Sequence, residues 1–327
     1  MHRCYMDNLL YSLNAVIPVF LIIVVGYVLK RTGMLNDEFA KTANGFVYKI
    51  TLPAMLLNNM MTCDIRHTFD GAYVLYCGAV TLTGILVVWG ISRLFLKDKS
   101  IVGEFVQGAY RGSAAILGIA LVQNISGNTT MAPLMMLGSV PLYNIFAVIV
   151  LIFENGEKTE SNQNGAGQRQ KKIAGSVKGI CKNPIILSIL GGMLLSFFDV
   201  GFPVILDKTI SSIGSLTTPL ALIVIGVGFE GRKAVKKIKP AVAASLIKLV
   251  IQPLVFLPIA VWYGFSADKI AAALVMLGAP TTATSYIMSK NMGHEGTLSS
   301  SIIMLTTLCS AFTITGWIFI LKSLNVI

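Results

Sequence analysis

Hydrophobic residues occur along this chain in long, nearly unbroken runs that are separated by short polar segments. A helix needs roughly 20 apolar residues to cross a bilayer core, and backbone groups in lipid must find their hydrogen bonds within the protein. The runs therefore predict helices, in an all-α integral membrane protein. We expect ten spans, at about residues 9–29, 39–58, 72–95, 104–124, 131–153, 183–199, 203–229, 240–264, 268–290 and 297–321.

The composition agrees with this pattern, because 54% of the residues are hydrophobic and only 13% are charged. Soluble domains carry about twice that share of charge. The first run, from Leu9 to Val28, has an alternative interpretation as a cleaved signal peptide. It ends at Lys30-Arg31 without a small-residue cleavage pattern, and we therefore interpret it as the first span.

Lys and Arg residues are concentrated in alternate loops. Most of the 26 lie in the loops near residues 30–41, 93–99, 158–182, 232–239 and 290, whereas the other loops hold only Arg3, Arg66, Lys208, Lys269 and Lys322. The positive-inside rule places the basic loops in the cytoplasm and both termini outside a plasma membrane. Topology thus accounts for the net charge of +11 without a nucleic-acid partner, and the basic loops are free to contact anionic lipid heads.

The polar segment 154–182 divides the chain into two similar halves, 1–153 and 183–327. Its composition is typical of a flexible, cytoplasmic basic linker. Each half holds five predicted spans, so the second half must enter the membrane from the opposite face and form an inverted repeat. Weak similarity supports a duplication, since Thr51-Leu52-Pro53-Ala54 in the second span matches Thr218-Pro219-Leu220-Ala221 in the seventh.

Small residues and proline interrupt the fourth span of each half in the middle. The first interruption runs from Arg111 to Gly118, and the second runs from Leu277 to Ser285 around Pro280. Glycine and proline are also ordinary in membrane helices, and that alternative stays open. Paired interruptions, however, are typical of the binding sites of secondary transporters.

A helix that is broken inside the membrane exposes unpaired backbone groups. The N-terminus of the resumed helix is a partial positive charge that favours an anion, and two such ends at the bilayer centre predict a carboxylate site. Pro280 lacks an N–H and suits the first turn of the resumed helix. The hydroxyls of Thr281, Thr282, Thr284 and Ser285 either line the site or bond to their own helix carbonyls.

Three basic residues lie within predicted spans. These are Lys49, Arg111 and Lys248, whereas the acidic residues lie in loops or near span ends. Buried charges in a membrane are costly and usually functional, so this asymmetry favours an anionic substrate over a proton antiporter with paired carboxylates. Snorkelling of the long side chains to the interface is the alternative.

The sequence contains no pattern typical of a metal site or of catalysis. Its five cysteines form no Cys-x-x-Cys pair, and His2, His67 and His294 are scattered. A nucleophile–base pair and a nucleotide-binding loop are also missing. We expect no metal, no cofactor and no enzymatic activity.

Several motifs, taken together in order and spacing, resemble one known family over nearly the whole chain. They are Thr51-Leu-Pro53, Arg111-Gly112, Pro219-Leu-Ala-Leu with Gly226, Lys248 with Pro253, and Gly278-Ala-Pro280 with Lys290-Asn-Met-Gly293. The chain resembles the auxin efflux carrier family, whose bacterial and archaeal members are relatives of the plant PIN-FORMED carriers.

The resemblance implies two inverted five-helix repeats in which broken spans 4 and 9 cross, as in the bile-acid-symporter type of fold. Spans 1, 2, 6 and 7 would form a scaffold, and spans 3–5 and 8–10 a transport unit that slides like an elevator. The family's substrates are organic anions such as malate, other carboxylates or indole-3-acetate. Plant members form dimers through the scaffold, so a homodimer is an expectation here.

This chain departs from the family in the fourth span. Ser113 stands where relatives commonly have Asn, and Ala120 stands where they have Pro. The first break must therefore rest on Gly112, Gly118 and the small residues between them. In the fifth span, Tyr143 and Asn144 either face the site or pack in the core with a satisfied hydrogen bond.

We expect the substrate carboxylate near Ser113, Pro280 and Thr281, with Arg111 and Lys248 supplying a favourable field or holding the crossing rigid. The complete expected binding set is Arg111, Ser113, Gly118, Tyr143, Asn144, Lys248, Gly278, Pro280, Thr281, Thr282 and Ser285. Residues expected to shape or break helices are Pro53, Gly112, Pro219 and Pro253.

These observations predict a secondary transporter that exports or exchanges a small carboxylate by alternating access. Without a deep carboxylate, movement down the membrane potential is the simplest driving force, although backbone carbonyls at the breaks remain available to sodium. Two alternatives stay open, namely a sodium-coupled organic-anion symporter and a ligand-sensing membrane protein that does not transport.

Overall fold

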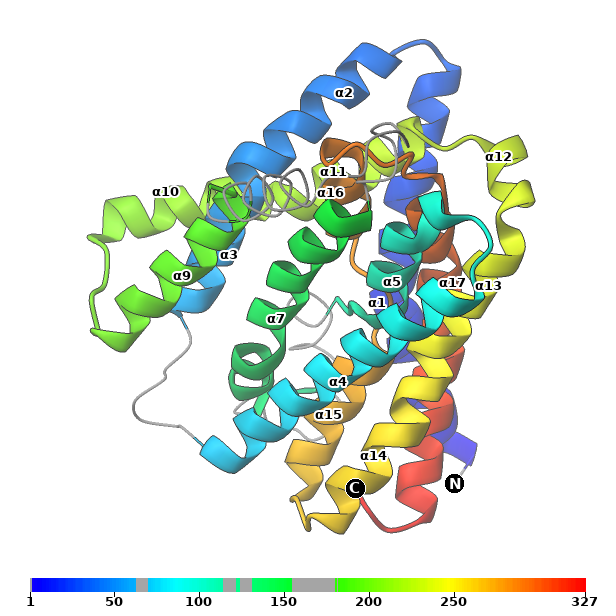
Figure 1. The fold of residues 1–327 in the computed structure, drawn as a ribbon. Helices are drawn as coiled ribbons and strands as arrows, with labels where there is room; N and C mark the ends of the chain where they lie inside the picture. The colour runs from blue at the N-terminus through cyan, green and yellow to red at the C-terminus, as the bar shows by residue number, and fades with distance from the viewer. Residues whose placement is uncertain (1, 63–69, 114–121, 124–130, 155–179, 181) are drawn as a thin grey trace, which may run out of the picture.

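The computed structural model describes residues 2–62, 70–113, 122–123, 131–154, 180 and 182–327. Within these ranges the chain is helical, and the only β-type pairing is one isolated bridge (Figure 1). The α-helices are α1 (His2–Arg31), α2 (Asp37–Phe46), α3 (Leu52–Met61), α4 (Gly71–Phe95), α5 (Val102–Tyr110), α7 (Met131–Glu154), α9 (Pro184–Phe197), α10 (Val204–Ser215), α11 (Thr217–Val227), α12 (Gly231–Lys236), α13 (Ile238–Leu246), α14 (Gln252–Trp262), α15 (Ala267–Gly278), α16 (Thr284–Asn291) and α17 (Thr297–Ser323).

Five helical stretches in the described part are long and apolar enough to cross a membrane. They are Gly71–Phe95, Met131–Glu154, Val204–Val227, Ile238–Trp262 and Thr297–Ser323. Large apolar side chains such as Leu94 and Trp262 are about four-fifths exposed on the outside of the bundle, as expected for a surface that lipid covers. The predicted all-α membrane class is therefore confirmed, whereas the ten spans and the inverted repeats stay predictions.

Two of the predicted helix-shaping prolines follow a single π-helical turn. The turn η1 (Val47–Thr51) precedes Pro53, and η4 (Ile247–Ile251) precedes Pro253. A proline lacks an N–H and its ring crowds the carbonyl four residues earlier, and π-turns of this kind are local insertions within α-helices. The backbone stays helical through both sites, so these prolines shape their helices without breaking them. Pro219 lies in the first turn of α11.

Glycine permits a close crossing between α1 and α11. A Cβ atom on Gly226 would lie 2.1 Å from the carbonyl oxygen of Ile23, and one on Gly26 would lie 2.4 Å from that of Ile223. Any side chain at either position would force the helices apart. This contact follows the small-residue rule for membrane helices.

The basic loops that the structure describes gather at one end of the bundle. Lys30 and Arg31 share a surface pocket with Arg232, while Lys233 and Lys237 pair with Glu295. Both chain termini lie at the opposite end (Figure 1). The structure therefore agrees with the prediction that these loops share one side, and which side faces the cytoplasm stays a prediction.

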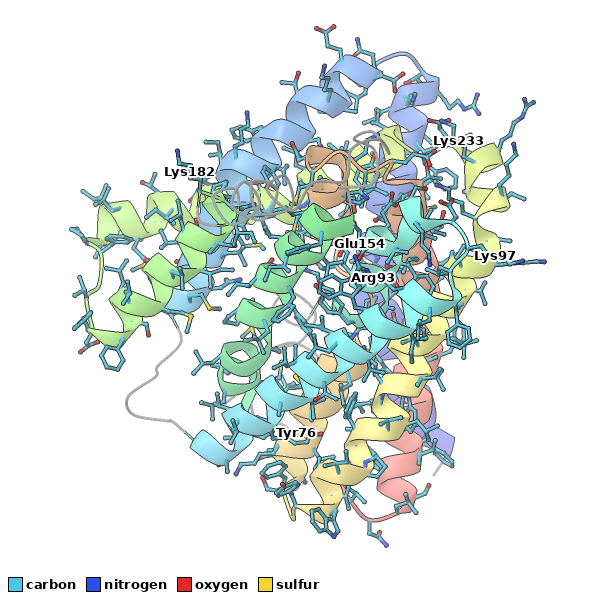
Figure 2. All side chains as sticks on the ribbon, in the orientation of Figure 1. Tyr76, Arg93, Lys97, Glu154, Lys182 and Lys233 are labelled. Atoms are coloured by element: carbon cyan, nitrogen blue, oxygen red, sulfur yellow. The ribbon has the colours of Figure 1, made fainter. Side chains whose placement is uncertain are left out.

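Near the same end, a buried carboxylate joins two of the longest helices. Glu154, at the end of α7, accepts hydrogen bonds from Trp89 Nε1 at 2.5 Å and from Arg93 Nε at 2.7 Å, both on α4 (Figure 2). Only 4% of the Glu154 side chain is exposed, against 56% for Arg93. The pair therefore fixes α4 against α7 at the edge of the bundle.

Candidate substrate site at two crossing helix breaks

Two helices end inside the bundle and meet each other at their ends. After α5 the backbone becomes extended at Arg111, and after α15 it becomes extended at Ala279. The extended segments form an antiparallel bridge between Gly112 and Thr281, and the N–H of Ser113 donates to the carbonyl of Pro280 at 2.8 Å. The paired segments agree with the crossing that the resemblance implied, and the continuation of the fourth span after Ser113 lies largely outside the described residues. Gly118 and Ala120 lie outside the described residues.

Neutral side chains donate to two carbonyls at the open end of α5. Thr281 Oγ1 donates to the carbonyl of Gly108 at 2.7 Å, and Gln252 Nε2 donates to that of Ala109 at 3.0 Å. Thr281 also uses its N–H to bond Thr306 Oγ1 at 3.1 Å. Since the last carbonyls of a helix have no partner within it, Thr281 acts here as a cap that holds the crossing together.

The structure corrects the expected role of Pro280. The resumed helix α16 begins at Thr284, so Pro280 lies in the extended segment and not in the first helical turn. Its carbonyl, rather than its missing N–H, makes the contact with the other break. Pro280 therefore contributes to the pairing of the two segments.

A small cavity of about 30 Å³ lies between α3, α7 and the two breaks. It has room for no more than a few water molecules. Its described lining contains no Asp or Glu, and it consists of Leu52, Met55, Leu56, Asn59, Arg111, Gly112, Ser113, Val140, Tyr143, Asn144, Thr282 and Thr284.

Arg111 is the charged residue in the described lining of this cavity. The residue is 3% exposed, and its guanidinium donates to Asn144 Oδ1 and to Met288 Sδ, the latter at 2.9 Å. Asn144 in turn is oriented by a 2.9 Å bond from its Nδ2 to the carbonyl of Val140. Within the described ranges, no ion pair joins Arg111 to a carboxylate. A buried cation without a counter-ion is costly, so the site is electrostatically suited to an anion.

The three basic residues of the spans have different environments. Arg111 is buried, Lys248 is completely buried at 0% exposure, and Lys49 is exposed. The snorkelling alternative is therefore wrong for Arg111 and Lys248. Lys49 lies outside the cavity lining.

Glu104 lies near a helix end, as expected for the acidic residues, but it is buried. This residue is in the first turn of α5 but is only 1% exposed. Its carboxylate accepts the N–H groups of Gly296 and Ser299, each at 2.8 Å, at the start of α17. The carboxylate therefore caps the positive end of another helix and does not line the cavity.

The cavity brings together some of the predicted binding residues and leaves others out. It includes Arg111, Ser113, Tyr143, Asn144 and Thr282, whereas Lys248, Gly278, Pro280, Thr281 and Ser285 lie outside its lining. Tyr143 has both predicted properties, because it lines the cavity and its hydroxyl also donates to the carbonyl of Met276 at 3.3 Å. Ser285 is fully buried, and its backbone carbonyl accepts Gln107 Nε2 at 3.2 Å.

One wall of the cavity was missed from the sequence. It consists of Leu52, Met55, Leu56 and Asn59 on α3. Their spacing of three, four and seven residues places them on one helix face. The amide of Asn59, at membrane depth on that face, was the sequence signal that could have indicated this wall. Thr284 was expected only as one of several hydroxyls after the second break.

Apolar membrane-length helices and two crossing breaks around a polar cavity define an integral membrane protein of the transporter type. The family comparison agrees with this class. The chain belongs to the membrane transport protein family, the family of the auxin efflux carriers, whose pattern matches residues 11–318.

Three relatives show the range of this similarity. A protein of Rhizobium meliloti (strain 1021) named "Putative malonate transporter" is 24% identical over 94% of this chain and 95% of its own length. An uncharacterized transporter of Methanocaldococcus jannaschii is 22% identical over 94% of this chain and 98% of its own length. The lysosomal cholesterol signaling protein of Mus musculus is 22% identical over 75% of this chain but only 29% of its own length.

Proposed function

We propose that this protein is a secondary transporter, without enzymatic activity, that moves a small organic anion through the site at the crossing breaks. The observation that carries this proposal is the buried guanidinium of Arg111, which faces a cavity without a described carboxylate. A carboxylate of the substrate would supply the missing negative charge and accept charge-assisted hydrogen bonds. Ser113, Asn144, Thr282 and Thr284 offer further polar contacts in the same lining.

A dicarboxylate such as malonate is the substrate class we favour. The name of the Rhizobium meliloti relative, which aligns over 94% of this chain, supports it. Malate and indole acids remain in the same chemical class of organic anions. The predicted exchange or export of a carboxylate thus becomes the proposed activity.

The proposed mechanism is an elevator-type movement of two helical groups. We assign segment 1–153 and segment 183–327 to two inverted five-span repeats joined by the linker 154–182. The scaffold would comprise α1, α2, α3, α9, α10 and α11, which contact one another, and the transport unit would comprise α4, α5, α7 and α13–α17. The cavity lies between α3 of the first group and the breaks of the second. Since it is too small for an organic anion, loading requires α3 and the breaks to separate.

We place the basic loops in the cytoplasm of a plasma membrane, with both termini outside, on the positive-inside rule. A homodimer through the scaffold completes the proposal. The apolar residues Val204, Ile205 and Leu206 at the start of α10 are at least half exposed, and they offer a surface for such contact or for lipid.

Ligand-induced stabilisation tests the proposal directly. A compound that binds only the folded state raises the melting temperature, so the purified protein is heated with malonate, malate, indole-3-acetate and a neutral amide of malonate. We expect stabilisation by a carboxylate and none by the amide. Arg111→Met should abolish the shift, whereas Lys49→Met, at an exposed lysine, should retain it. Stabilisation by the neutral compound alone would contradict an anion site.

A further inference from the structure

Lys248 is a completely buried lysine that the cavity does not use. It lies in the π-turn η4, and its side chain reaches the end of α15. Its Nζ donates to the carbonyl of Met276 at 3.1 Å and to that of Leu277 at 2.8 Å. These carbonyls belong to the last turn of α15, where a helix leaves its C=O groups without internal partners.

The two broken helices differ in how their carbonyl ends are satisfied. At the end of α5, a hydroxyl from Thr281 and an amide from Gln252 occupy the carbonyls. At the end of α15, the amine of Lys248 occupies the carbonyls of Met276 and Leu277, and the hydroxyl of Tyr143 donates to the first of these as well. The C-terminal end of a helix carries a partial negative charge and favours a cation, so the second break has a cation built into it.

The ammonium also lies against the other break. A Cβ atom on Gly112 would be 3.0 Å from Lys248 Nζ and 3.0 Å from the carbonyl oxygen of Met276. The Nζ atom of Lys248 is therefore held where the two interrupted segments cross. In transporters with broken helices, carbonyls at half-helix C-termini are the groups that coordinate a sodium ion.

We infer that Lys248 is a resident cation, whose ammonium group occupies the carbonyl site at the end of α15 that a coupling sodium ion would need. The inference rests on the proposed function, since it concerns how transport at the same crossing is driven. Lys248 is then a positioning residue that holds α15 against the first break. Anion movement through the site is independent of sodium, because the cation at the end of α15 is part of the protein chain and does not dissociate.

A melting experiment without any substrate tests the cation site. Wild type, Lys248→Ala and Lys49→Ala are heated in the chlorides of sodium, methylammonium or N-methyl-D-glucamine at equal ionic strength. Lys49 is the matched control, because it lies in the other π-turn but is exposed. We expect Lys248→Ala to melt at a lower temperature and to regain part of the loss with sodium or methylammonium in a saturable manner. Wild type and Lys49→Ala should melt alike in all three salts.

Two further measurements keep the inference testable if the alanine variant does not fold. Lys248→Met keeps most of the side-chain volume without the charge, and it should show a lower melting temperature than wild type. Anion uptake by wild type should also be equal in sodium and in N-methyl-D-glucamine. Sodium-dependent melting or uptake of wild type, or a Lys248→Met variant as stable as wild type, would overturn the inference. Because the melting experiment contains no carboxylate, it gives its result even if the protein moves no organic anion.

Discussion

A single methyl group at Gly112 should disturb the crossing of the two breaks. In the Gly112→Ala variant, the new Cβ atom would lie 3.0 Å from Met276 O, 3.0 Å from Lys248 Nζ and 3.4 Å from Lys248 Cε. Contacts of 3.0 Å are shorter than carbon normally makes with these atoms. Met276 O belongs to the backbone of α15, and Lys248 Nζ is bonded to it, so neither atom can move away alone.

The expected cost follows from the rigidity of these neighbours. Forcing extra volume into a packed interior typically costs about 1–3 kcal/mol, and we expect Gly112→Ala to fall in that range. Gly278 is the matched control in the other break. A Cβ atom there would lie 3.7 Å from Leu274 Cδ1 and 3.7 Å from Pro253 Cγ, which are ordinary contacts. As Gly278 ends α15, alanine should be neutral or should stabilise by up to about 1 kcal/mol.

The assay compares thermal unfolding of wild type, Gly112→Ala and Gly278→Ala in one detergent. We expect a lower melting temperature for Gly112→Ala alone. Equal melting of Gly112→Ala and wild type would refute the close contact between the breaks, and so would an equal loss in both variants.

Three other substitutions probe separate parts of the structure. Arg111→Met removes a hydrogen-bond donor, and such a bond to a charged ligand is worth about 1.5–3 kcal/mol. The affinity for a carboxylate, measured by titration, should therefore fall about 10- to 100-fold. An unchanged affinity would show that the carboxylate binds at another site. Asp70 accepts a hydrogen bond from Lys269, which holds the pKa of its carboxyl below the usual value, so its contribution is present above about pH 3.9 and is lost as the pH falls through the lowered pKa. Acid unfolding of Asp70→Asn should therefore lack that part of the pH dependence, and superimposable pH curves would argue against the bond. Glu104→Ala leaves two backbone N–H groups at the start of α17 unpaired, and it should destabilise the folded protein by at least about 1–3 kcal/mol. Glu230→Ala, at an exposed glutamate, should leave the stability unchanged. Similar melting temperatures of the two variants would contradict the capping role of Glu104.

The helical pattern was largely accessible from the sequence, since long apolar runs fix helices in a membrane. The breaks were accessible as well, because Gly112, Gly278 and Pro280 interrupt those runs in matching places. The position of Pro280 within the second break was not, because the resumed helix begins only at Thr284. Its carbonyl pairs with Ser113, a contact across more than 160 residues that local propensity does not encode.

Which charged side chains are buried depends on tertiary packing and could not be predicted from the sequence. Lys49 and Lys248 both precede a proline at similar spacing, yet one is exposed and the other is fully buried at the crossing. Glu104 lies near a helix end, as the sequence predicts for the acidic residues, but the start of α17 covers it. Which face of a helix contacts which neighbour depends on the packing of the whole bundle. For the same reason, the contribution of α3 to the cavity was not predicted from the sequence.

Transport of malonate by the purified protein in lipid vesicles is the most direct test of the central claim. Vesicles loaded with unlabelled malonate are diluted into labelled malonate, and entry of label by exchange is measured for wild type, Arg111→Met and Lys49→Met. We expect saturable entry for wild type and Lys49→Met, and a loss of entry for Arg111→Met. Entry that is equal in all three proteins, or that neutral solutes but no organic anion can inhibit, would contradict an anion carrier with its site at the crossing breaks.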